Sequence, residues 1–210
     1  MQYISTRGDA STLDFASVLL EGLALDGGLY VPAEWPELTT ADLRSFNGLG
    51  YAEIATRVIA PFVGGTIPDD DLERLIHEAY GTFRHDEVVP LSDLAPGEHV
   101  AELFWGPTLS FKDIALSLIG RLFEYELDRR GATVTVVGAT SGDTGSAAIE
   151  ACRDRDGVEL VMLHPEGRIS EIQRLQMTTV DSANIHNVAI DGTFDDCQDL
   201  VKAMFGSSVS

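Results

Sequence analysis

Residues 133–153 read TVTVVGATSGDTGSAAIEACR, and this stretch decides the expected fold. It opens with a short apolar run rich in valine, which predicts a buried strand over 133–138. A helical pattern follows over 145–153, after a loop that holds glycines and hydroxyl side chains. A strand that passes through such a loop into a helix is the building unit of a parallel α/β sheet.

The same alternation extends outward in both directions. We expect further strands at 99–104, 158–163 and 183–190, and helices at 111–130, 170–178 and 194–205. This order predicts an α/β domain with a mainly parallel sheet covered by helices.

The residues before this alternation have a different character. A short strand is expected at 2–5, and helical spacing predicts helices at 13–23, at 51–60 (ending at Pro61) and at 69–80. The stretch 90–97 carries proline and glycine and predicts a boundary. We therefore expect a small, mostly helical domain at 1–94, followed at 95–210 by the first part of the sheet domain. More strands should follow, so the chain is expected to be a fragment.

Charge and composition limit the classes of function. The formal net charge is −20 and only two lysines occur, which argues against binding to nucleic acid. No apolar stretch is long enough to span a bilayer, and no secretory signal is visible, so we expect no membrane partner and a cytoplasmic location. The two cysteines are expected to be reduced thiols, buried or partly buried, without a zinc site.

Lys112 lies in the run GPTLSFKD at 106–113. Ser110 and Asp113 have the spacing of a capping box, which would place Lys112 in the first turn of a helix. The positive end of the helix dipole disfavours a second positive charge there, so the lysine is more available as a neutral amine. A neutral amine is what Schiff-base chemistry with an aldehyde cofactor requires. The alternative is an ordinary solvated lysine with Asp113 as its surface partner.

Two further segments are candidate anion sites. In the loop at 138–146, glycines let the backbone approach a ligand, and the N–H groups at the following helix start would bind a phosphate or a carboxylate. The alternative is a tight turn without a ligand. Arg168 follows the strand at 158–163 and would either face an anionic substrate at the carboxyl edge of the sheet or stay in solvent.

Together these motifs carry a family resemblance. The segments GPTLSFKD, GATSGDTGSAA at 138–148, PEGRISEIQ at 165–173 and DGTFDDCQDLVKAMF at 191–205 resemble those of threonine synthases. The segments ISTRG at 4–8 and LLEGLALDGGLYVP at 19–32 resemble the N-terminal domain of that family. The resemblance implies the tryptophan-synthase-β-like fold of pyridoxal-phosphate enzymes, fold type II, with a three-layer catalytic domain.

The resemblance also implies a set of site residues. Lys112 matches the lysine that forms a Schiff base with pyridoxal phosphate, and Phe111 would pack near the cofactor ring. Asp143 stands where many relatives have an asparagine facing the phenolic oxygen of the cofactor. The substrate and anion loop would comprise Thr140, Ser141, Gly142, Thr144 and Gly145.

The activity implied is that of a lyase of threonine biosynthesis, in the aspartate-family pathway. It would convert O-phospho-L-homoserine and water to L-threonine and phosphate. The family's second glycine-rich loop, which holds the cofactor phosphate, has no convincing counterpart in residues 146–210, so the fragment alone is expected to be inactive. The alternatives are another pyridoxal-phosphate-dependent phospho-lyase of the same fold group and a non-catalytic anion-binding module.

Overall fold

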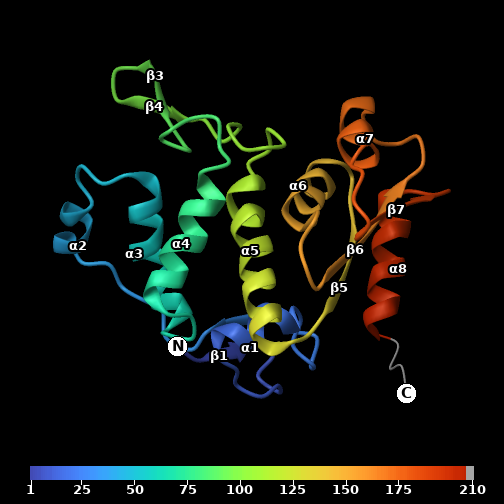
Figure 1. The fold of residues 1–210 in the computed structure, drawn as a ribbon, viewed down its shortest axis with the longest axis horizontal. Helices are drawn as coiled ribbons and strands as arrows, with labels where there is room; N and C mark the ends of the chain where they lie inside the picture. Colours follow the sequence, from blue (N-terminus) through green and yellow to red (C-terminus); the bar gives the residue numbers. More distant parts are fainter. Residues whose placement is uncertain (207–210) are drawn as a thin grey trace. The chain divides into compact units, whose positions relative to one another are not determined.

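The computed structural model describes residues 1–206 and divides the chain into two compact units, Met1–Gly81 and Thr82–Ser210 (Figure 1). The last four residues of the second predicted domain, 207–210, lie outside the described residues. The domain boundary expected near residue 94 stays a prediction, because a division by contacts does not show which pieces fold independently.

The first unit combines a small antiparallel sheet with four helices. Its strands β1 (Tyr3–Ser5) and β2 (Tyr30–Pro32) pair, and α3 packs on α4. Along α4, apolar residues at helical spacing are buried, among them Leu72, Ile76 and Ala79. The helices are α1 (Phe15–Glu21), α2 (Thr40–Ser45), α3 (Tyr51–Val63) and α4 (Asp69–Tyr80).

The prediction that Pro61 ends its helix is wrong, because α3 continues to Val63. Proline lacks an N–H, so at Pro61 only the hydrogen bond to the carbonyl of Arg57 is lost. The helix instead ends at Gly64, whose backbone is left-handed (φ 61°) and whose N–H donates to the Ala60 carbonyl at 3.0 Å. The six-residue helix α2 was not predicted.

The second unit begins with an antiparallel hairpin, β3 (Leu91–Ala95) paired with β4 (Glu98–Ala101). The strand predicted at 99–104 therefore exists in part, but it pairs with β3 and does not join the parallel sheet. The stretch predicted as a boundary at 90–97 contains the whole of β3 and the turn that follows it. Every residue of both strands is exposed, so no buried face marks them in the sequence.

The parallel sheet confirms the α/β prediction. Its strand order is β5 (Val134–Ala139), β6 (Val158–Pro165) and β7 (Ile185–Ile190), with both pairs parallel. Figure 1 shows α5 (Asp113–Arg130) and α6 (Asp143–Cys152) to one side of these strands and α8 (Phe194–Gly206) to the other. The helix α7 (Glu171–Thr178) packs on α6, and the central strand β6 is buried along most of its length.

Helices α5 and α6 approach each other closely where Gly120 lies. A Cβ atom at Gly120 would lie 2.2 Å from the carbonyl oxygen of Ala151, so only glycine fits this contact. Both helices begin at the carboxyl edge of the sheet, because α6 follows β5 directly and α5 precedes β5. The close contact thus fixes two helix starts beside each other.

The two cysteines, Cys152 and Cys197, are free and buried, as predicted. Burial raises the pKa of the Cys152 thiol to about 11. Across residues 1–206, no helix is both long enough and apolar enough to cross a membrane.

Candidate functional site

Lys112 stands immediately before the first residue of α5, half-buried, with its Nζ 4.6 Å from the centre of the Phe111 ring. Phe111 itself is exposed. Within the described part of the chain Lys112 forms no ion pair, whereas the exposed Lys202 lies 3.4 Å from Asp199. The amine of Lys112 is therefore not committed to a carboxylate.

The capping box predicted for this helix is wrong. The Ser110 side chain accepts a hydrogen bond from the Lys112 amide (3.3 Å), and it does not cap the Asp113 amide. Asp113 is 2% exposed and folds back onto Thr108, accepting from its amide at 2.8 Å and from its hydroxyl at 2.6 Å. Leu109 adopts a φ of 63°, which non-glycine residues rarely do. The loop before Lys112 is thus held by Asp113 in a strained shape.

The second loop, residues 140–145, is organised by one hydroxyl group. Thr140 is 1% exposed, and its Oγ1 accepts hydrogen bonds from the amides of Gly142 (3.0 Å) and Gly145 (2.8 Å). These two amides are therefore not available to a ligand, so the anion site predicted at this helix start would depend on the other N–H groups of the loop. The methyl group of Thr140 lies against Gly145, where a Cβ would be 2.5 Å from it.

Three other amides of this loop, those of Ser141, Asp143 and Thr144, have no hydrogen-bond partner among the described residues. All three residues are exposed, and Asp143 and Thr144 form the first turn of α6. Backbone N–H groups at a helix start attract anions through both hydrogen bonding and the helix dipole. The loop can hold an anion through these three donors.

Gly142 has an unusual backbone, with a φ of 141°, directly before α6. Only glycine adopts this conformation readily. A Cβ there would also lie 2.3 Å from Oε1 of Gln173, so the side chain of Gln173 covers this glycine. The Nε2 group of Gln173 donates a hydrogen bond to the carboxylate of Asp143.

The helix α7 joins the two loops. Gln176 on α7 donates from Nε2 to the carbonyl of Thr108 at 3.1 Å, and Gln173 contacts the loop at 140–145. The lysine loop and the anion loop are therefore both bound to one short helix. We did not predict either glutamine, although Ser170 and Gln173 have the S-x-x-Q spacing of a capping box. Ser170 does cap α7, accepting from the Gln173 amide at 3.3 Å.

Arg168 is exposed in the turn that follows β6, with its amide donating to the Pro165 carbonyl. Its positive charge contributes in a minor way to the lowered pKa of Asp196, whose main cause is hydrogen bonding from Thr193. A contact of Arg168 with a substrate stays a prediction. His164, by contrast, is 6% exposed near the carboxyl end of β6, and its Nδ1 has no partner within residues 1–206.

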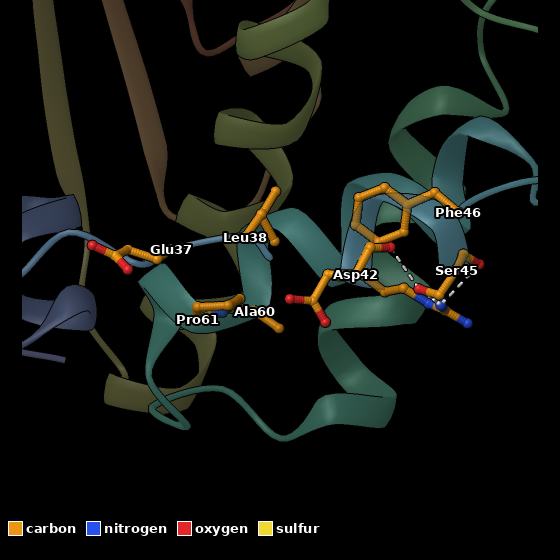
Figure 2. A pocket seen from close by; sticks show the side chains of 8 residues that line it. Glu37, Leu38, Asp42, Ser45, Phe46, Ala60 and Pro61 are labelled. Carbon is orange, nitrogen blue, oxygen red and sulfur yellow. Dashed lines mark hydrogen bonds between the residues drawn. The ribbon is translucent and has the colours of Figure 1, made fainter. Parts of the chain in front are cut away.

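The first unit contains a shallow hollow of about 410 Å³, lined by charged and apolar residues (Figure 2). Three of its polar side chains already have partners: Asp42 accepts from Thr39, and Arg57 donates to Ser45 Oγ at 3.2 Å. None of the predicted site residues lines it. The lining comprises Glu37, Leu38, Asp42, Ser45, Phe46, Arg57, Ala60 and Pro61.

Comparisons with known proteins decide the family. Residues 101–207 match the family described as pyridoxal-phosphate dependent enzyme, and residues 2–80 match the threonine synthase N terminus. The chain belongs to the pyridoxal-phosphate dependent enzyme family. The resemblance inferred from the motifs is confirmed.

Several of the relatives and solved structures that the chain matches are threonine synthases. The chain is 57% identical to the threonine synthase of Pseudomonas aeruginosa over 98% of its own length and 44% of that protein. Against the structure of pyridoxal-phosphate-bound threonine synthase from Brucella melitensis the TM-score is 0.92, with 53% identity, over 99% of this chain and 45% of that one. Against the yeast threonine synthase structure the TM-score is 0.90, with 44% identity, over 99% of this chain and 44% of that one. The chain thus spans less than half the length of these relatives.

The residues of this family member fit the cofactor that names the family. Pyridoxal phosphate carries an aldehyde, which needs an amine without a carboxylate partner, and Lys112 supplies one. The unpartnered Nδ1 of buried His164 lies on the strand that leads into α7, at the same sheet edge. An orphaned buried polar atom at this edge is consistent with a bound polar group.

Proposed function

We propose that this chain supplies the reactive amine and one anion-binding loop of a pyridoxal-phosphate-dependent threonine synthase. The reaction would convert O-phospho-L-homoserine and water to L-threonine and phosphate. The observation that carries the proposal is the binding of the Lys112 loop and the 140–145 loop to one helix, α7, in a chain 57% identical to a threonine synthase. The substrate would be a small molecule, and the enzyme would act in the cytoplasm, where free thiols such as Cys152 persist.

The cofactor, when bound, acts as an electron sink that stabilises negative charge on substrate carbons. Lys112 would anchor the cofactor through its amine and then hold or move a proton at Nζ during the successive steps.

The loop at 140–145 would bind the carboxylate of the substrate or a phosphate oxygen. Its available donors are the amides of Ser141, Asp143 and Thr144, with Thr140 holding the loop in shape. Three backbone donors fixed by the fold orient a substrate without reorganisation during the reaction. Asp143 is positioned by Gln173 and would face the cofactor side of the loop.

The experiment is borohydride trapping. The chain is incubated with pyridoxal phosphate, reduced with borohydride and digested, and the modified lysine is identified by mass spectrometry. We expect the reduced adduct on Lys112, because Lys202 is exposed and paired with Asp199. The matched variants Lys112→Ala and Lys202→Ala should lose and keep the adduct, respectively.

An adduct found mainly on Lys202, or retained by Lys112→Ala, would remove Lys112 from this role. We also propose that the 210-residue chain by itself forms no threonine from O-phosphohomoserine, since it spans only 44% of the Pseudomonas relative. Measurable threonine formation by the purified chain would contradict this.

A further inference from the structure

Gln173 uses both ends of its side-chain amide. Its Nε2 donates to the Asp143 carboxylate, and its Oε1 accepts from the Ser170 hydroxyl at 2.8 Å. Because Ser170 is also the N-cap of α7, the side-chain amide of Gln173 is held by a residue at the start of its own helix. With its nitrogen and its oxygen both hydrogen-bonded, the side-chain amide of Gln173 has one orientation. It therefore always presents its N–H donor, and not its carbonyl oxygen, to the Asp143 carboxylate.

The position of this side chain explains a glycine in the facing loop. Any side chain at residue 142 would collide with the Gln173 amide, since a Cβ there would lie within 2.7 Å of Oε1, Cδ and Nε2. Gly142 is buried, although its neighbours Ser141 and Asp143 are exposed. The amide of Gln173 is therefore packed on the loop as well as hydrogen-bonded to it.

Gln176 follows Gln173 by three positions on α7 and so lies on the same helical face. Its contact with the Thr108 carbonyl ties α7 to the loop that carries Lys112. The rest of α7 has little burial: Ile172 is 73% exposed, and Met177 is the buried residue of the helix. The two glutamines thus carry the polar contacts of α7 with the site.

We propose that Gln173 is a positioning residue of the candidate site, which holds Asp143 and covers Gly142 so that the loop at 140–145 keeps its shape. Gln176 connects the same helix to the Lys112 loop, which sets the spacing between the amine and the anion donors. The inference rests on the proposed function for what the loop binds, but the positioning itself concerns contacts within this chain.

The test is hydrogen–deuterium exchange of the 210-residue chain and its Gln173→Glu variant. Glutamate has the same shape but replaces the donor with an acceptor, so it repels the Asp143 carboxylate. The protected amides to follow are those of Gly145 and Ser146, which bond to Thr140 Oγ1 and to the Gly142 carbonyl. We expect their exchange to be roughly three- to tenfold faster, the effect of losing about one hydrogen bond.

Gln176→Glu is the matched control, with the same chemical change one turn away. It should accelerate exchange at the Leu109 amide, which bonds to the Gly106 carbonyl, and leave Gly145 unchanged. Gln173→Ala removes the donor without adding a charge, and serves if the glutamate variant fails to fold. It should show a smaller acceleration at Gly145.

A rescue separates positioning from general loosening. Adding Asp143→Asn to Gln173→Glu reverses donor and acceptor, so the pair can form again, and exchange at Gly145 should return to within about twofold of the original chain. Unchanged exchange in Gln173→Glu, or no recovery in the double variant, would overturn the inference. Because no cofactor is present in this measurement, its result is independent of whether borohydride labels Lys112.

Discussion

Replacing Thr140 with valine tests how one hydroxyl group builds the loop at 140–145. Valine has nearly the same shape as threonine but no hydrogen-bond acceptor. The amides of Gly142 and Gly145, now bonded to Thr140 Oγ1 at 3.0 and 2.8 Å, would both lose their partner in a buried place. An unsatisfied buried group costs about 1–3 kcal/mol. Two such groups are left unsatisfied, but the loop is open to water on one side, and this reduces the cost. We therefore expect Thr140→Val to lower the free energy of unfolding by about 2–4 kcal/mol.

Thr140→Ser is the matched comparison, because it keeps the acceptor and loses only the methyl group that lies against Gly145. Loss of one buried methyl costs about 1 kcal/mol. At about 2–4 °C for each kcal/mol, the valine variant should unfold roughly 4–16 °C lower and the serine variant only a few degrees lower.

The assay is thermal unfolding followed by tryptophan fluorescence. The chain has two tryptophans, and Trp35 of the first unit is 67% exposed. In a Trp35→Phe background, Trp105 reports on the second unit alone. If the valine variant were as stable as the parent, or the serine variant less stable than the valine one, the hydroxyl would not be what holds the loop.

Three further outcomes follow from buried groups. Gly120→Ala should lower the unfolding temperature by several degrees although alanine favours helices, because its Cβ would meet the Ala151 carbonyl at 2.2 Å; a rise would show that α5 and α6 can separate. Burial raises the pKa of the Glu126 carboxyl, but hydrogen bonds from Arg129 and Arg130 outweigh it, so the net pKa is lowered. The carboxylate therefore stabilises the fold above its unfolded pKa of about 4.3, and this contribution is lost as pH falls through the folded pKa. Glu126→Gln should cost about 1–3 kcal/mol at pH 7 in denaturant titrations and progressively less below pH 4; a difference independent of pH would refute the ion pair as its cause. Neither Cys152 nor Cys197 should react with a thiol reagent at pH 8 until urea is added, since both are buried and their thiol pKa values are raised; rapid native labelling would contradict their burial.

Helices and strands that bury one face or a whole apolar run were predicted correctly from the sequence. The helix predicted at 69–80 is found at these bounds, because one face of α4 supplies the core of its unit. The strand predicted at 158–163 from its apolar run is found as β6, which extends two residues further, to Pro165. Both features depend on a simple periodicity, which the sequence displays directly.

Features set by individual contacts were not predictable in the same way. Asp113 was expected to pair with Ser110 and instead accepts from Thr108, and its carboxylate packs against Gly106, a contact that residue spacing does not reveal. The strand at 99–104 was expected in the sheet, yet β4 pairs with β3, and both strands are exposed. In the candidate site, Lys112 and the loop were predicted from motifs, whereas Gln173 was not predicted because its partner Asp143 lies 30 positions away.

Three helices, α5, α6 and α7, begin at the same edge of a sheet in a chain whose formal charge is −20. Each helix start is equivalent to about half a positive charge, carried by the backbone and not by any side chain. Repulsion between the acidic side chains and an incoming anion acts at long range and is screened over about 10 Å at 0.1 M salt, while contacts at a partly buried helix start are screened less. Moderate salt should therefore strengthen phosphate binding at this edge, the reverse of what an arginine- or lysine-built site shows. Phosphate titrations at 20 mM and 150 mM salt would reveal the sign, and weaker binding at the higher concentration would mean that side-chain cations carry the attraction.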